Sequence, residues 1–525
     1  MFIENFQVDP RAGIWYSSNG LMTQRSAPNL RTRASGVLVH PSSLPGPAGI
    51  GDLGSPSLRF AEALASSRQT WWQMLPIGPT GFGNSPYSAL SSSAGNPLLV
   101  SLERLADEGW LSGADTVGPA WRLDRVPYAE AEAFKNERLR RAFSTFERGA
   151  TQAQRDRFEE FRRSTSWLTD WSLYRALKDS NNGAVWTEWE PGVRSRAPAA
   201  LAAARDALGA EIRYHEFVQH AFARQWDELH ARCRELGIGL VGDVPFYVPH
   251  DSAEVWANQE LFDLGRRGRP MRVAGVPPDD FTKDGQLWGF PLYNWERMRA
   301  QNYAWWLARF RTTLARFDAV RIDHFIGFHR AWAVPARLRT ALRGRWIMGC
   351  DGEVFERLKR ESGSLELIAE DLGVVTPEVE RLRDGFDLPG IRVLQFGFGW
   401  DPAQTHLPHK YPKRSLAATG THDNDTSLGW YEAIDNVGMK DWVHRYLQTN
   451  GKEINWVMIR AVLNSPADTA ILPIQDLLSL GSEARMNRPG IATGNWAWRM
   501  APGALTPEIL ARLRTLTEES GRARS

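Results

Sequence analysis

Short apolar runs alternate with amphipathic helical stretches along most of the 525-residue chain. Such runs, when they are too short for helices and rich in β-branched and aromatic residues, are typical of strands buried on both faces. Eight are expected, at residues 35–44, 70–79, 238–248, 317–325, 365–373, 391–398, 415–424 and 468–478. Eight buried strands separated by helices or insertions predict an α/β fold, a parallel (β/α)8 TIM barrel.

The segments between these runs show where helices and insertions belong. FAEALASS, residues 60–67, has a helical pattern and completes a first β-α-β unit. Residues 216–237 place apolar side chains on one face and end at Gly237, a residue suited to a helix cap. A further helix is expected at 302–317, and TPEVERLRDG begins another, with Thr376 as its N-cap and proline directly after it.

Two segments interrupt the alternation. Residues 101–212 are polar and rich in Arg, Glu and Ala, which predicts an inserted, largely helical subdomain. Residues 249–300 are rich in Pro, Gly and aromatic residues and are expected to form a loop-rich subdomain at the active site. Residues 1–34 are interpreted as an N-terminal extension, and 35–525 as the catalytic barrel that carries both insertions.

A doubly wound open sheet is the alternative fold. That fold commonly carries a glycine-rich phosphate loop between a strand and a helix. No GxGxxG opens a helix after a strand here, and no GxxxxGK occurs. The barrel is therefore the favoured architecture.

Composition narrows the classes of function. The apolar content of 42% supports a large core. No uninterrupted apolar run of about 18 residues occurs, so no membrane span is predicted. A net charge of +2 without a basic stripe argues against nucleic acid. The presence of only two cysteines, Cys233 and Cys350, fits a protein of the reducing cytoplasm. An export signal would begin with basic residues followed by an apolar run, but Glu4 and Asp9 lie in that region, so no export signal is expected. Monomer and dimer both stay open.

Tryptophan is abundant, with 23 residues. Its large rigid ring fills protein cores, and it also stacks on flat ligand faces such as those of sugar rings. Core packing is the favoured interpretation for most of these residues.

Acidic residues follow the expected strands at their carboxyl ends, where a (β/α)8 barrel builds its active site. They are Asp243, Asp323, Glu370, Asp371, Asp423 and Asp425. A single carboxylate at such a place is more commonly a cap or an ion-pair partner, and Asp371 and Asp425 keep that interpretation. Asp323, Glu370 and Asp423 come from three different strands, and burial of unpaired charge near one point is unfavourable without a function.

These residue types indicate carboxylate chemistry without a metal or cofactor. Cleavage of a glycosidic bond needs one protonated carboxyl group and one ionised carboxylate. Arg321 lies on the same strand face as Asp323 and is expected to keep it ionised as a nucleophile. Glu370 suits the acid, because nearby like charges would raise its pKa. Asp423 is expected to bind sugar hydroxyls in the transition state, beside His422.

Several ordered motifs resemble those of one enzyme family. They are SGVLVHPSSLPGPAGIGDLG, WWQMLPIGPTGFGNSPYSALSSSAGNP, GDVPFYVPHDSAEVWAN, VRIDHFIGF, IAEDLG, TGTHDNDTSLGW and RPGIATGNWAWR. Together they make the chain similar, from Ser35 to about Arg499, to the 4-α-glucanotransferases, the amylomaltase or disproportionating-enzyme family, glycoside hydrolase family 77.

The resemblance implies a retaining transglycosidase that acts on maltooligosaccharides and other α-1,4-glucans. It assigns the nucleophile to Asp323, the general acid/base to Glu370 and transition-state stabilisation to Asp423. It also implies that Tyr87 stacks on the sugar at the cleavage position. A further set is expected to contact sugar or carboxylates: Asp243, Arg321, His422 and Trp288.

Some positions depart from the family pattern. Asn84 replaces an aspartate, Asp280 a tyrosine, Phe290 an asparagine, Ile326 an arginine and His329 a glutamate. None of them removes a candidate catalytic carboxylate, and they bear on acceptor preference and on the balance of transfer and hydrolysis. An α-glucan hydrolase with the same three carboxylates is the alternative function, and an inactive glucan-binding protein is a more distant one.

Overall fold

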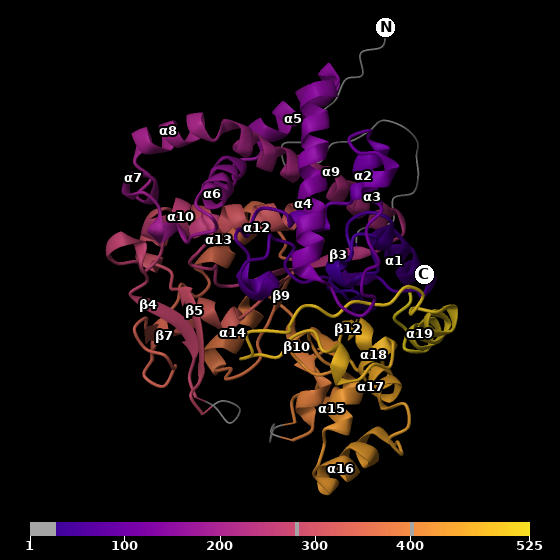
Figure 1. Ribbon diagram of the computed structural model, residues 1–525. Helices are drawn as coiled ribbons and strands as arrows, with labels where there is room; N and C mark the ends of the chain where they lie inside the picture. Colours follow the sequence, from indigo (N-terminus) through magenta and orange to yellow (C-terminus); the bar gives the residue numbers. More distant parts are fainter. Residues whose placement is uncertain (1–27, 279–282, 400–403, 525) are drawn as a thin grey trace.

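The computed structural model describes residues 28–278, 283–399 and 404–524 (Figure 1). Eight parallel strands close into a barrel in the order β1-β12-β11-β10-β9-β6-β3-β2, which confirms the predicted fold. The strands are β1 Ala34–Leu38, β2 Trp71–Gln73, β3 Gly239–Val244, β6 Ala319–Ile322, β9 Leu367–Ala369, β10 Gly390–Val393, β11 Ser415–Ala418 and β12 Thr469–Pro473. Each overlaps one expected run but ends earlier, since the chain leaves the ladder where the site begins.

Helices surround the barrel, and several of them pack an apolar face against the strands. Those outside the long insertion are α1 Ser55–Ser66, α10 Ala253–Ala257, α11 Trp295–Ala300, α12 Ala304–Arg316, α13 Glu353–Ser362, α14 Pro377–Gly385, α15 Ser427–Glu432, α16 Val437–Leu447, α17 Ile454–Leu463, α18 Ile474–Leu477 and α19 Pro507–Glu519. Helix α12 packs on β3 and β6, and α17 packs on β11 and β12. The expected helices at 60–67, 302–317 and 376–385 are confirmed by α1, α12 and α14.

The long insertion between β2 and β3 is helical, as its sequence predicts. Its helices are α2 Leu102–Asp107, α3 Gly113–Thr116, α4 Tyr128–Gly149, α5 Gln152–Ser164, α6 Leu168–Ser180, α7 Pro191–Arg194, α8 Pro198–Ala207 and α9 Gly209–Glu235. Figure 1 shows α4, α5, α6 and α8 gathered on one side of the barrel. Helix α9 runs through the expected boundary at residue 212 and ends before Gly237, whose φ of 76° suits a cap.

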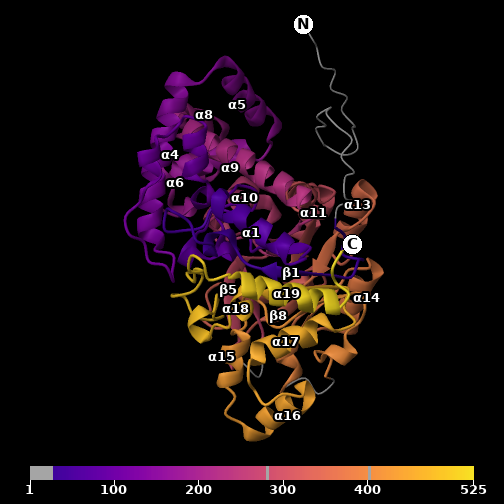
Figure 2. The same ribbon diagram turned by 90° about the vertical axis from the view of Figure 1, so that its right-hand side faces the viewer.

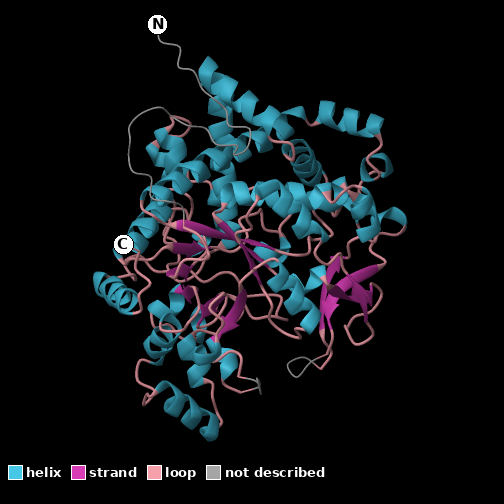
Figure 3. Ribbon diagram, turned by 180° about the vertical axis from the view of Figure 1, so that it is seen from behind, coloured by secondary structure: helices cyan, strands magenta, loops and turns pink. Residues whose placement is uncertain are grey.

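A second, antiparallel sheet lies partly within residues 249–300, the segment expected to be a loop-rich subdomain. It has the order β5-β4-β7-β8, with β4 Arg272–Val276, β5 Gln286–Pro291, β7 Arg330–Pro335 and β8 Arg345–Met348. Figure 3 shows these strands as a group beside the barrel. Their short length and their Gly and Pro content hide the strand pattern, and half of the sheet comes from residues beyond β6.

The first and last described segments of the chain meet where the barrel closes. Residues 1–27 of the expected extension lie outside the described part, whereas Arg33 donates hydrogen bonds to the carbonyl oxygens of Leu463, Ser465, Ala467 and Ser520. Helix α19 packs against α1 and α17 (Figure 2). None of the described helices is long and apolar enough to cross a membrane.

Candidate active site

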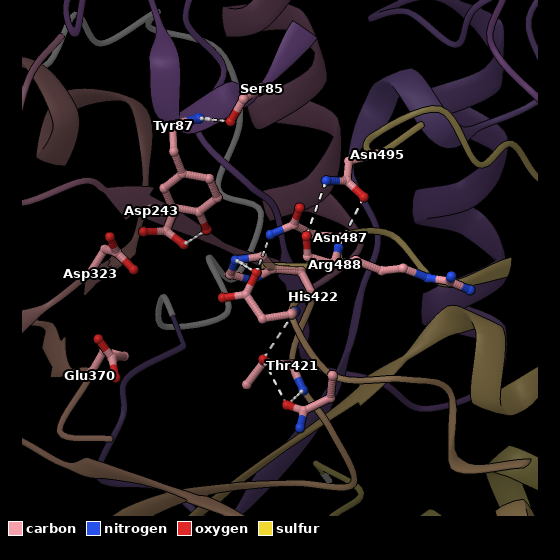
Figure 4. Close-up of polar contacts among 12 residues, drawn as sticks. Ser85, Tyr87, Asp243, Asp323, Glu370, Thr421, His422, Asn487, Arg488 and Asn495 are labelled. Carbon is pink, nitrogen blue, oxygen red and sulfur yellow. Dashed lines mark hydrogen bonds and ion pairs between the residues drawn. The ribbon is translucent and has the colours of Figure 1, made fainter. Parts of the chain in front are cut away.

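The acidic residues expected to form the site do lie at the carboxyl ends of the barrel strands. Asp243 is the penultimate residue of β3, Asp323 directly follows β6, and Glu370 directly follows β9. Asp423 comes five residues after the end of β11. Figure 4 shows Asp243, Asp323 and Glu370 together with Tyr87 and His422.

Arg321 joins two of these carboxylates. Strands β3 and β6 pair with Asp243 beside Arg321, and the guanidinium donates to Asp243 Oδ2 at 2.6 Å and to Asp323 Oδ1 at 3.0 Å. The Asp243 side chain is fully buried, whereas that of Asp323 is 28% exposed. Burial opposes the cation, but Asp243 and the neighbouring acids hold the pKa of Arg321 well above its usual value. The predicted Arg321–Asp323 pair is confirmed, and Asp243 is a second partner.

Tyr87 lies against the same carboxylate. Its hydroxyl donates to Asp243 Oδ2 at 2.8 Å, and its ring stacks on His422 with centroids 5.0 Å apart and planes 15° apart. Burial and Asp243 raise the pKa of Tyr87 well above its usual value, so the hydroxyl remains a donor. The remaining oxygen of Asp243, Oδ1, is buried without a hydrogen-bond partner among the described residues.

Glu370 is held by backbone groups near Asp323. Its Oε2 accepts from the N–H of His324 at 2.7 Å, and its Oε1 accepts from the N–H of Leu372 at 2.9 Å. Burial is the main cause that raises its pKa to about 7; Asp323 raises it further, while Arg321 and the two N–H groups oppose the shift. The expected rise is confirmed, but its main cause is burial and not the neighbouring charge.

Asp423 is positioned by residues that the sequence did not indicate. The side-chain amide of Asn487 donates to Asp423 Oδ1 at 2.6 Å, and Arg485 donates to the Asp423 carbonyl at 2.6 Å. His422 Nε2 lies 3.3 Å from the same Oδ1. The Asp423 side chain stays 44% exposed. Asn487 directly precedes the motif RPGIATGNWAWR, and this position is the one feature of the sequence that could have indicated its role at the site.

Trp288, in β5, lies beside the residue that follows Asp323. Its ring meets His324 edge to face, with centroids 4.8 Å apart. Tyr247 contacts both rings. Burial lowers the pKa of His324 to about 4, so the imidazole is neutral near pH 7. The small sheet therefore brings an aromatic wall to the expected nucleophile.

Asp371 and Asp425 have the structural contacts expected of them. Asp371 accepts from Arg383 and from the N–H of Ile391, and Asp425 accepts from the hydroxyl of Ser482. Both carboxylates therefore serve the packing around the strand ends.

The departures from the family pattern surround the site. Ile326 is buried after β6, and His329 Nδ1 lies 2.6 Å from Asp351 Oδ1. Phe290 stacks on Tyr247 with centroids 6.2 Å apart, and Asn84 takes a left-handed φ of 57°. Asp280 lies outside the described residues.

One cluster of side chains has the spacing of a metal site, within the part of the chain that the structure describes. It consists of Asp179, Glu211 and His215, on α6 and α9. Arg140 binds both oxygens of Glu211, at 3.0 and 2.9 Å, and Arg175 binds Asp179. Because these arginines already neutralise the charge of the carboxylates, we do not assign the cluster as a metal site.

A closed parallel barrel with carboxylates, an arginine and aromatic rings at the carboxyl ends of its strands defines a carbohydrate-active enzyme of the TIM-barrel class. A family profile described as 4-alpha-glucanotransferase matches residues 39–506. The chain belongs to this family, glycoside hydrolase family 77.

Individual relatives agree. The chain is 45% identical to a 4-alpha-glucanotransferase of Thermus thermophilus over 499 residues, which cover 93% of this chain and 99% of that one. It is 44% identical to a 4-alpha-glucanotransferase of Synechocystis sp., over 94% of this chain and 99% of the relative. The solved amylomaltase of Streptococcus agalactiae, in complex with acarbose, superposes with a TM-score of 0.91 at 36% identity, over 94% of this chain and all of that one.

Proposed function

We propose that this protein transfers a segment of an α-1,4-glucan to the 4-hydroxyl of an acceptor glucan or glucose. The family relationship over most of the chain supports this activity. The amylomaltase of S. agalactiae binds acarbose, which supports maltooligosaccharides as ligands here. One observation supports the mechanism most directly: Glu370 accepts a hydrogen bond from the backbone N–H of His324, the residue that follows Asp323.

In the first half of the reaction, an oxygen of Asp323 attacks the anomeric carbon of the donor glucan. Glu370 gives its proton to the glycosidic oxygen, which leaves with the rest of the chain, and a β-linked glucosyl-aspartate remains. Asp323 suits this role because Arg321 donates to its Oδ1 at 3.0 Å while 28% of its side chain stays exposed. A pKa of about 7 leaves Glu370 substantially protonated near neutral pH.

In the second half, Glu370 is a carboxylate and acts as the base. It takes the proton from the 4-hydroxyl of the acceptor, whose oxygen attacks the anomeric carbon as the bond to Asp323 breaks. Two inversions restore the α-linkage. The same residue thus serves as acid and then as base, which a pKa near the working pH permits.

The other side chains bind and orient the sugar. Asp423 keeps an exposed carboxylate that accepts sugar hydroxyls more strongly as positive charge develops on the ring. Tyr87 provides a ring face, and His422 behind it provides a donor. Asp243 and Arg321 hold the floor of the site together.

Transfer requires the acceptor sugar to outcompete water. Trp288 and Phe290, in β5, supply a half-buried aromatic surface beside His324 on which an acceptor ring can stack and exclude water, and the buried ring of Tyr247 packs behind them. We propose this part of the small sheet as the acceptor side. Both cysteines are buried free thiols, which supports the cytoplasm as the place of action.

Incubation with maltotriose tests the function. Longer oligosaccharides together with free glucose are expected from transfer. Reducing ends that increase without longer products would instead assign the protein as a hydrolase, and the absence of any conversion would leave it as a binding protein. The variants Asp323→Ala and Glu370→Gln are each expected to abolish most turnover while the chain stays folded.

A further inference from the structure

A chamber that is open on one side lies beside Tyr87 and Asp243. It is lined by residues 76–78, by parts of 86–94 and 243–249, and by α12. Its volume not filled by protein atoms is about 550 Å³, its open side included. Asp243 therefore borders both the active site and the chamber.

Several residues that line the chamber have polar side-chain atoms that are buried without a hydrogen-bond partner among the described residues. They are Asp243 Oδ1, the Tyr247 hydroxyl, Arg309 Nε and the Ser92 hydroxyl. Asp243, Tyr247 and Arg309 are only 5%, 4% and 4% exposed. Buried polar groups are nearly always paired, and a carboxylate oxygen and a guanidinium N–H are the most unfavourable groups to leave alone.

The hydrogen-bonding needs of these atoms indicate what kind of molecule binds in the chamber. Asp243 Oδ1 needs a donor, Arg309 Nε–H needs an acceptor, and the Tyr247 hydroxyl takes either. A molecule that both donates and accepts hydrogen bonds, as a hydroxyl group does, fits these atoms, and water is the smallest such molecule. The chamber has room for a few water molecules beside these polar atoms.

Arg309 also holds the chain next to Asp243. Its guanidinium donates to the carbonyl oxygens of Pro245 at 2.5 Å and Phe246 at 3.2 Å, directly after β3. Asp243 in turn binds Arg321, and Arg321 binds Asp323. A continuous set of contacts thus connects α12, outside the barrel, with the proposed nucleophile.

We propose that the chamber is a water-binding site whose ordered cluster joins Asp243 Oδ1, the Tyr247 hydroxyl and Arg309 Nε. Arg309 and Tyr247 are then positioning residues, which fix Asp243 and, through Arg321, the orientation of Asp323. The effect on turnover rests on the proposed transferase function, whereas the water site does not.

Tyr247→Phe tests the site, because it removes only the hydroxyl. If water pairs that group, Tm falls by about 1 °C or more and kcat falls several-fold, with KM within about twofold of its original value. Ser172→Ala is the matched control, since the Ser172 hydroxyl is also buried without a partner among described residues but does not line the chamber. This control is expected to leave Tm unchanged or raised.

A high-resolution crystal structure gives the second measurement, with water density expected about 2.6–3.2 Å from Asp243 Oδ1 and Arg309 Nε. Arg309→Lys is expected to keep the fold and lower kcat about tenfold. A Tyr247→Phe protein that melts like Ser172→Ala, or a chamber without bound water, would overturn the proposal. Failure of the wild-type protein to convert maltotriose would overturn the transferase function alone, because Tm and density report on the water site independently.

Discussion

Glu370 accepts a hydrogen bond of 2.7 Å from the backbone N–H of His324, the residue that follows Asp323. His324 has a left-handed φ of 48°, a conformation that is uncommon for residues other than glycine and typical of functional sites. The proposed acid and the proposed nucleophile are therefore held by one short backbone segment. The barrel backbone therefore sets the position of Glu370 relative to the residue after Asp323, and the Arg321 side chain holds the Asp323 carboxylate itself.

The pH dependence of turnover is expected to report Glu370. Since its pKa is about 7, kcat/KM should fall above about pH 7 as the acid loses its proton. Initial rates of maltotriose conversion from pH 5 to pH 9 measure this limb. A rate that stays level up to pH 9 would contradict the assignment of Glu370 as the acid.

Glu370→Gln is expected to affect stability more favourably at alkaline than at acidic pH. The folded-state pKa is raised from 4.5 to about 7, so the folded state binds the proton more tightly than the unfolded state. The stabilisation from this proton is complete below about pH 4.5 and is lost as the pH rises to about 7. The uncharged amide avoids this loss of up to about 3 kcal/mol, but at every pH its NH2 group cannot accept one of the two backbone hydrogen bonds. Thermal melts should show the Tm of the variant, relative to the wild type, higher at pH 8 than at pH 5, and an equal difference at both values would argue against this cause.

Asp243→Asn is expected to destabilise the protein strongly. Asp243 is the fully buried partner of Arg321 at 2.6 Å, and removal of one member of a buried ion pair costs about 3–5 kcal/mol. Tyr87→Phe, which removes only the 2.8 Å charge-assisted hydrogen bond to the same oxygen, should cost about 1.5–3 kcal/mol. Urea unfolding compares the two variants. Equal losses would mean that the Asp243–Arg321 pair contributes no more than one charge-assisted hydrogen bond.

Asn487→Ala is expected to reduce kcat/KM about tenfold or more with little loss of stability. The Asn487 amide is a charge-assisted partner of Asp423 Oδ1 at 2.6 Å, and such hydrogen bonds contribute about 1.5–3 kcal/mol. Without it, the 44% exposed carboxylate can turn away from the sugar. Asn495→Ala is the matched control, because Asn495 bonds to the carbonyl oxygens of Arg488 and Ile491 on the same segment. Similar kinetics for both variants would point to a general loosening of that segment.

Trp288→Ala is expected to shift product from transfer towards hydrolysis, because the ring beside His324 supplies the proposed acceptor surface. The ratio of reducing ends to longer oligosaccharides from maltotriose measures this shift. Leu287→Ala, at the neighbouring position of β5, is the control, and it should leave the ratio unchanged since Leu287 points to the opposite face of the strand and is 36% exposed. An unchanged ratio in Trp288→Ala would contradict the assignment of Trp288 to the acceptor side.

The sequence by itself determined the eight barrel strands and the acidic residues at their ends. Buried parallel strands are continuous apolar runs, and an acidic residue marks the point where β3, β6, β9 and β11 leave the core. The Arg321–Asp323 pair was predictable as well, because residues two apart in a strand share a face. The family motifs added the substrate class and the roles of the carboxylates.

Only the tertiary structure decided which distant residues support these groups. Asn487 is 64 residues from Asp423, and Tyr87 is 156 residues from Asp243. The small sheet likewise joins β4 and β5 to strands that follow β6. Local patterns record the periodicity of one element, whereas these contacts depend on how separate elements pack, and burial, the main cause of the raised pKa of Glu370, exists only once they have packed.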